Sequence, residues 1–199
     1  MGLDMDLRKI KKIEGLTFEE TIKIDDDILN GDELLIEKYK EYITHPYTFS
    51  SNIKALNEPL MDWRKANQIH SWFVNNIQNG KDDCQNYEVS KDNLESLLSV
   101  CKAVENEFNK AKKVVGKVVN GQRWENGGWI DILEDGNVFE HLNYEKIIEL
   151  LPPCSGFFFG STNIDERYYD KITFTIEGLE KLLRTVDFEK EWVYYNSSW

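Results

Sequence analysis

The fold prediction starts from one stretch of the chain, Trp63-Arg64-Lys65-Ala66-Asn67-Gln68-Ile69-His70-Ser71-Trp72-Phe73. Within it, Ala66, Ile69 and Phe73 recur at the spacing of one face of a helix. The same apolar pattern extends from Leu60 to Gln78, and the following Asn-Gly pair is typical of a helix end. We therefore predict a helix over residues 60–78.

The predicted helix would bring several polar and planar side chains together. Arg64, Asn67 and His70 would share one arc of about a third of its circumference, with Trp63 and Trp72 beside them. An arginine presents a planar fork to phosphate or carboxylate, an asparagine pairs with a base edge, and a tryptophan offers a stacking face. These five residues are candidate ligand-binding residues, or they satisfy one another as buried structural groups.

A second dense segment, Gly156-Phe157-Phe158-Phe159-Gly160-Ser161-Thr162-Asn163-Ile164-Asp165, follows a Pro-Pro pair. Gly160, Ser161 and Thr162 can place backbone N–H groups and hydroxyls against an anion, with Asp165 nearby. A structural role is the alternative, with a buried strand between two glycine kinks and Asp165 as the N-cap of the next helix. The segment matches neither a nucleotide-triphosphatase loop nor a serine nucleophile elbow.

Charge and cysteine usage exclude several classes of protein. The 199 residues carry a net charge of -12, which argues against direct binding of DNA or RNA through phosphates. We expect no membrane span, no secretory signal and a cytoplasmic location. The histidines and the three cysteines lack metal-ligand spacing, so neither a metal nor a cofactor is predicted. The acidic residues before Cys84 should raise the pKa of its thiol.

The remaining pattern predicts an α+β fold, predominantly helical, with a small antiparallel sheet that includes the N- and C-terminal strands. Short strands are expected at residues 3–10 and 191–199, and we predict that they pair. Helices are expected at 17–24, 33–42, 90–113, 144–150 and 166–186, several with capping residues at their starts. Residues 45–59 are read as a loop. Residues 1–199 form a single domain in this prediction, with a hairpin-rich excursion at 114–139.

Five blocks of the chain resemble a family of small proteins found in bacteriophages, prophages and gut bacteria, most of them described only as hypothetical. The blocks are Met1–Met5, Trp63–Phe73, Asn79–Cys84, Ser155–Thr162 and Tyr194–Trp199. The resemblance covers nearly the whole chain in order. It implies no particular activity. A phage setting favours accessory proteins that counter host defence, including proteins that capture nucleotide-derived immune signals.

Three functional hypotheses remain open from the sequence. The leading one is a non-enzymatic, phage-type accessory protein that binds a small planar anionic ligand, such as a nucleotide-derived signal. The second is a hydrolase of such a ligand, with His70 as general acid or base and Asp165 or Asp4 as its orienting carboxylate. The third is an acidic interaction module that occupies a basic host protein. Self-association is left open in all three.

Overall fold

The computed structural model describes residues 2–45 and 53–199 and has an α+β architecture. A four-stranded antiparallel sheet has the order β2-β1-β6-β3. Its strands are β1 (Asp4–Lys11), β2 (Asn57–Arg64), β3 (Tyr87–Glu88) and β6 (Glu191–Ser198). The predicted pairing of the terminal strands is confirmed, since β1 and β6 are antiparallel neighbours from Asp4↔Ser198 to Lys11↔Glu191.

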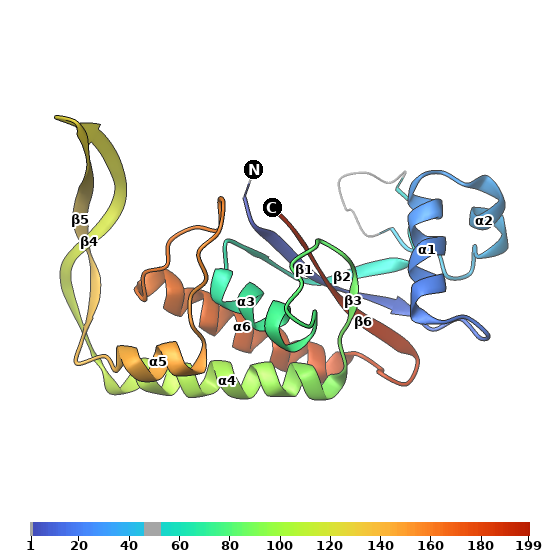
Figure 1. The fold of residues 1–199 in the computed structure, drawn as a ribbon. Coiled ribbons are helices and arrows are strands. Elements are labelled where there is room, and N and C mark those ends of the chain that lie inside the picture. Colours follow the sequence, from blue (N-terminus) through green and yellow to red (C-terminus); the bar gives the residue numbers. More distant parts are fainter. Residues whose placement is uncertain (1, 46–52) are drawn as a thin grey trace.

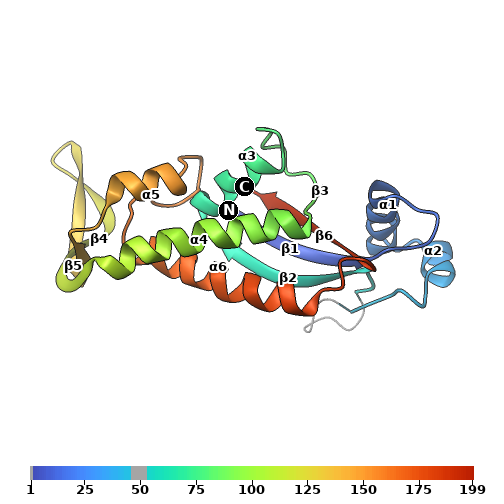
Figure 2. The same cartoon turned by 90° about the horizontal axis from the view of Figure 1, so that it is seen from below.

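The described residues contain six helices (Figure 1). They are α1 (Phe18–Leu29), α2 (Glu33–Lys38), α3 (Asn67–Asn76), α4 (Lys91–Lys110), α5 (Tyr144–Leu150) and α6 (Glu166–Thr185). Helices α4 and α6 lie side by side along the sheet, whereas α1 and α2 gather at its far end (Figures 1 and 2).

Alternation along the strands divides the core into two clusters. Val193 and Tyr195 of β6 pack with α3, α4 and α6 in the larger cluster. The intervening Tyr194 belongs to the smaller cluster, where it meets Phe18 of α1. Because successive residues of a strand point to opposite faces, one strand serves both clusters.

The predicted helix over residues 60–78 is wrong in its first third. Residues 57–64 form strand β2 beside β1, and only residues 67–76 are helical. Lys65 separates the two elements with a φ of 55°, in the left-handed region that side chains rarely adopt. Strand pairing with β1 outweighed the helical spacing, because Met61 and Trp63 bury the same face as Met5 and Leu7.

The other predicted elements differ mainly in their ends. Helix α1 runs to Leu29, five residues further than predicted, and α2 ends earlier, at Lys38. Helices α1 and α4 begin with capping boxes at Thr17 and Ser90, which agrees with the expected capping residues at helix starts. The predicted 45–59 loop overlaps β2 at its end, and residues 46–52 of it lie outside the described residues.

The predicted excursion at 114–139 is one long hairpin, formed by β4 (Lys112–Glu125) and β5 (Gly128–Glu140). We call this hairpin the arm. It projects from the end of α4 away from the body of the molecule (Figures 1 and 2). Phe139 anchors its foot against Phe108 of α4, and Lys113 forms an ion pair with Glu166 of α6 at 2.7 Å.

Candidate functional site

The predicted ligand-binding residues are separated because residues 57–64 form strand β2 and only residues 67–76 are helical. Trp63 and Arg64 lie on adjacent positions of β2 and therefore point to opposite faces of the sheet. The Trp63 indole is buried and donates a 2.9 Å hydrogen bond to Thr175 of α6. The Arg64 side chain is 68% exposed, 3.7 Å from a carboxylate oxygen of Asp4. Trp72 is buried in the larger core cluster. The structure does not bring these three side chains together.

The side chain of Asn67 binds backbone groups of the protein, whereas the prediction assigned it to a ligand. Its side chain is buried and uses both ends to hold the loop that precedes α6. The Nδ2 atom donates to the carbonyls of Phe159 and Ser161, at 3.2 and 2.9 Å, and Oδ1 accepts from the N–H of Cys154 at 3.1 Å. Asn67 thus fixes the segment around Gly160 against the start of α3.

This clamp creates a pocket between the start of α3 and the first turns of α6. The pocket has a volume of about 200 Å³. Lys65 and Gln68 line it from the α3 side, and Arg167, Tyr168 and Lys171 line it from α6. Gly160, Ser161, Asn163 and Asp165 of the clamped loop complete the wall. We call it the Lys171 pocket.

Three of the lining side chains are cations that lack ion-pair partners within residues 2–45 and 53–199. Lys65, Arg167 and Lys171 are each absent from the ion pairs of this part of the chain, although acids outnumber cations 36 to 24. Lys171 Nζ donates to the backbone carbonyl of Lys65, and Arg167 donates to the Asn120 amide at 2.7 Å. Donors on both cations remain for a ligand.

The pKa of Lys171 is lowered by its surroundings in the pocket. Burial lowers its pKa from the ordinary value of 10.5, and the neighbouring charges of Lys65 and Arg167 lower it further. Asp165 acts in the opposite direction, but its carboxylate already accepts the N–H of Tyr168 at 3.0 Å as the N-cap of α6. A cluster of cations of this kind is stabilised when an anion joins it.

Gln68 supplies an observation that does not depend on charge. Its side chain is 2% exposed and lines the pocket, and its Nε2 atom has no hydrogen-bond partner in the described part of the protein. An unpaired buried donor costs about 1–3 kcal/mol. A ligand oxygen in the pocket would satisfy it.

The glycine-bracketed segment contributes to the pocket only in part. Gly160 has a φ of 92°, and a Cβ atom there would lie 3.1 Å from that of Lys65, so glycine allows the loop to approach α3 closely. The Ser161 hydroxyl accepts from the N–H of Asn163 at 3.0 Å. Thr162 is exposed and does not line the pocket.

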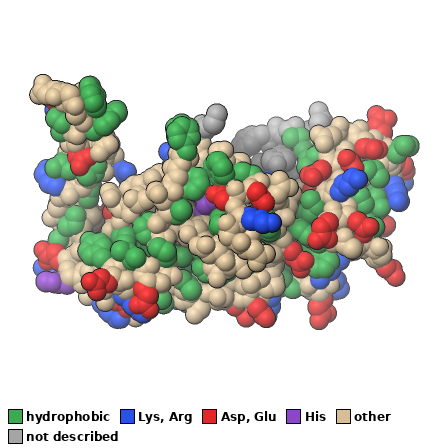
Figure 3. Space-filling model, viewed as in Figure 1, with side chains coloured by type: hydrophobic (Ala, Val, Ile, Leu, Met, Phe, Trp, Pro, Cys, Tyr) green, Lys and Arg blue, Asp and Glu red, His purple; other side chains and the backbone are tan. Residues whose placement is uncertain are grey.

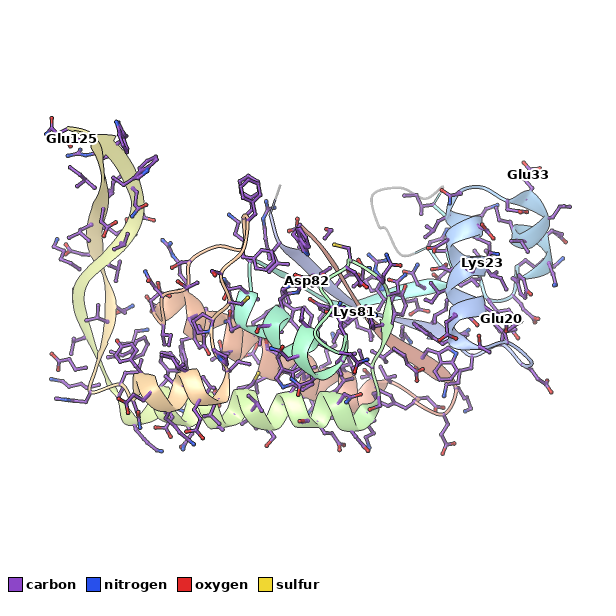
Figure 4. The ribbon with its side chains drawn as sticks, viewed as in Figure 1. Glu20, Lys23, Glu33, Lys81, Asp82 and Glu125 are labelled. Carbon is purple, nitrogen blue, oxygen red and sulfur yellow. The ribbon has the colours of Figure 1, made fainter. Side chains whose placement is uncertain are left out.

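His70 lies behind this loop in a buried hydrogen-bonded array. Its ring is 1% exposed, with Nδ1 2.7 Å from the Tyr195 hydroxyl and Nε2 3.0 Å from Asp82. Asp82, labelled in Figure 4, comes from the loop after α3 and also accepts from the Trp199 indole at 2.9 Å. Burial raises the pKa of Tyr195 well above its usual range, so its hydroxyl stays a donor.

This array leaves neither ring nitrogen of His70 free for proton transfer to a ligand. The carboxylates expected beside His70 are elsewhere, since Asp165 caps α6 and Asp4 lies 3.7 Å from Arg64. The structure places Asp82 in that position instead.

The described residues give little support for a reactive thiol, a metal site or a membrane span. Burial raises the pKa of Cys101 to about 12, and burial followed by the charge of Asp82 raises the pKa of Cys84. Across residues 2–45 and 53–199, no group of three or more His, Cys, Asp or Glu side chains is arranged to hold a metal ion. The same part of the chain contains no helix long and apolar enough to cross a membrane.

Comparisons with known proteins returned no match to a family model, a curated protein or a solved structure. The candidate site therefore rests on its own geometry. The sequence analysis identified three of its residues, Gly160, Ser161 and Asp165, and overlooked six: Lys65, Gln68, Asn163, Arg167, Tyr168 and Lys171. The spacing of Arg167 and Lys171, four residues apart at the start of a predicted helix and directly after the glycine-rich segment, was the available signal.

Proposed function

We propose that the protein binds a small phosphate-bearing molecule in the Lys171 pocket and releases it unchanged. The observation that carries the proposal is the convergence of three cations without ion-pair partners and one unpaired buried amide on a single cavity. Phosphate oxygens accept several hydrogen bonds at once and carry the compensating charge.

The size of the pocket indicates how much of the ligand it holds. Its volume of about 200 Å³ lies below the roughly 300–1,000 Å³ typical of sites that enclose a whole drug-sized ligand. A phosphate and part of its sugar would fill it, and a base would lie outside. Phe157 and Phe158 are exposed on the same loop, with ring centroids 4.2 Å apart, and offer a stacking surface for that base.

The ligand class we favour is a nucleotide-derived signal, held rather than cleaved. The resemblance to phage and prophage proteins supports sequestration of a host immune signal in the host cytoplasm as the biological role. The array around His70 supports binding over hydrolysis, because both ring nitrogens are engaged away from solvent.

Calorimetric titration with pyrophosphate, AMP and adenosine tests the proposal. We expect both phosphate compounds to bind and adenosine, which lacks phosphate, to bind far more weakly. Lys171→Ala should weaken binding roughly tenfold to a hundredfold, since a charge-assisted hydrogen bond contributes about 1.5–3 kcal/mol. Arg64→Ala is the matched control, because it removes a neighbouring cation that does not line the pocket.

Two results would overturn the proposal. One is the absence of binding by either phosphate compound, and the other is equal loss of affinity in the Lys171 and Arg64 variants. Denaturing the loaded protein and identifying the released compound separates a binder from a hydrolase, because a hydrolase would return an altered nucleotide.

A further inference from the structure

The arm carries an unusual amount of exposed apolar surface. Trp124 and Trp129 are 62% and 66% exposed near its tip, and their rings meet edge to face at 5.5 Å. The strand register places Leu133 and Val115 on the same face as this pair, and both are exposed. On this face the Gln122–Asp131 and Lys117–Asp135 pairs lie between the tryptophans, Leu133 and Val115. The exposed tryptophan pair is therefore a compact apolar patch, and such patches mark interaction sites.

The arm also has little to stabilise it by itself. Asn120, past the middle of β4, accepts a hydrogen bond from Arg167 at 2.7 Å, and among the described residues the extensive packing of β4 and β5 is with each other. A two-stranded hairpin alone is marginally stable in water. The length of β4 and β5 is therefore better explained by a surface that covers them than by the folding of the body.

A second apolar surface lies at the foot of the arm. Tyr144 and Ile148 of α5 are four residues apart, hence on one face of the helix, and are 47% and 51% exposed. Figure 3 shows hydrophobic side chains gathered both on the arm and in the region of α5. Tyr144 borders a cavity beside Val118 and Phe139 of its own arm, but the tip of the arm points away from α5 (Figure 1), and Tyr144 and Ile148 remain about half exposed.

The net charge of the arm indicates which kind of partner can bind to it. Residues 112–140 contain four cations and five acids, a net charge of -1, so the rest of the chain carries -11 of the total -12. A basic partner would be drawn to the acidic body, whereas the near-neutral arm can approach a second acidic copy with little repulsion.

We propose that two copies of this chain exchange arms, with Trp124 and Trp129 of each copy packing on Tyr144 and Ile148 of the other. Such an exchange is isologous, so one contact is made twice about a two-fold axis. A 13-residue ribbon is about 43 Å long at roughly 3.3 Å per residue and about 10 Å wide. If the two exchanged arms lie antiparallel, one arm face buries about 430 Å² per chain. The tip and the α5 stripe of each chain extend this contact toward the roughly 800 Å² per chain of a stable interface.

Sedimentation velocity of the full chain at micromolar concentrations tests this proposal. The wild-type protein should sediment as a dimer, and the Trp124→Ser/Trp129→Ser variant should sediment as a monomer. Ile148→Glu should also give a monomer although it leaves the arm intact. Leu34→Ser, which removes an exposed apolar side chain of α2, is the matched control and should remain a dimer.

Circular dichroism of each variant checks that the fold is retained. A monomeric wild-type protein would overturn the proposal and assign the arm to a different partner. A dimer that survives both the arm variant and Ile148→Glu would equally overturn it, because self-association would then use another surface.

Discussion

At the level of single residues, the Lys171 pocket depends on an amine whose pKa lies below the ordinary lysine value. A bound phosphate would stabilise the charged amine, so binding requires the protonated form. We therefore predict that affinity for pyrophosphate falls as pH rises through the lowered pKa, and that this loss begins below the 10.5 of a free lysine.

Titration calorimetry from about pH 7 to pH 10 measures this effect, with Lys171→Arg as the comparison. Because an arginine stays charged throughout that range, the affinity of the variant should fall less with rising pH than that of the wild-type protein. Identical pH profiles for both proteins would mean that Lys171 does not contact the phosphate.

Asp25 is a second residue whose importance the structure reveals. Its carboxylate is buried and accepts hydrogen bonds from the N–H groups of Leu56 and Asn57 and from the Asn57 side chain. These bonds tie α1 to the start of β2. We predict that Asp25→Ala lowers the free energy of unfolding by roughly 3 kcal/mol, measured by urea denaturation.

Asp26→Ala provides the control for Asp25. Burial and the charges of Asp25 and Asp27 raise the pKa of Asp26, so its ionised form is disfavoured in the fold. Removing that carboxylate should leave stability unchanged or slightly increased. Equal destabilisation by both substitutions would show that the effect belongs to the helix and not to the Asp25 network.

Substitution of His70 distinguishes a structural role of this residue from a catalytic one. We predict that His70→Gln lowers the free energy of unfolding by about 1–3 kcal/mol, because it disturbs the hydrogen bonds to Tyr195 and Asp82. Pyrophosphate affinity should change little, since His70 does not line the Lys171 pocket. Product formation by the wild-type protein, lost in this variant, would reverse the assignment.

At the level of elements, β6 is the strand on which the sheet depends most. It pairs with β1 along its whole length and with β3 on its other edge, and it supplies residues to both core clusters. Deleting residues 192–199 should therefore abolish cooperative unfolding of the body, as followed by circular dichroism during heating. A truncated protein that melts like the full chain would contradict the sheet described above.

The sequence predicts best those helices that have both a regular apolar face and an N-cap residue, and those strands that alternate regularly between apolar and polar residues. Helices α4 and α6 combine a regular apolar face with Ser90 and Asp165 at their N-termini, and the terminal strands alternate clearly. Their local preferences agree with the tertiary contacts they make.

The errors arise where tertiary contacts override local pattern. Residues 60–64 fit a helical face, but pairing with β1 makes them a strand, and Lys65 in the left-handed region then reverses the chain into α3. Since Arg64 faces outward for this reason, the predicted ligand cluster separates. The Lys171 pocket joins α3 to α6, elements about a hundred residues apart, and no local spacing reports that contact.

At the level of the whole molecule, the arm and the body are separable. Replacing residues 116–136 with an Asn-Gly turn would join Val115 to Asn137, which already face one another in the register. We predict that this shortened protein keeps the melting temperature of the body within a few degrees, because the distal arm adds nothing to either core cluster. A large loss of melting temperature would show that the arm is part of the folding unit.

The pairing of β1 with β6 also bears on how the protein is made. The two central strands of the sheet are made at opposite times, since β1 is the first of its strands to be synthesised and β6 is the last. Until residues 191–198 emerge, β1 has an open edge and its buried face, including Leu3, Met5 and Leu7, lacks part of its cover. Folding of the sheet therefore waits for the synthesis of residues 191–198, and the long separation in sequence between β1 and β6 makes this pairing slow to form.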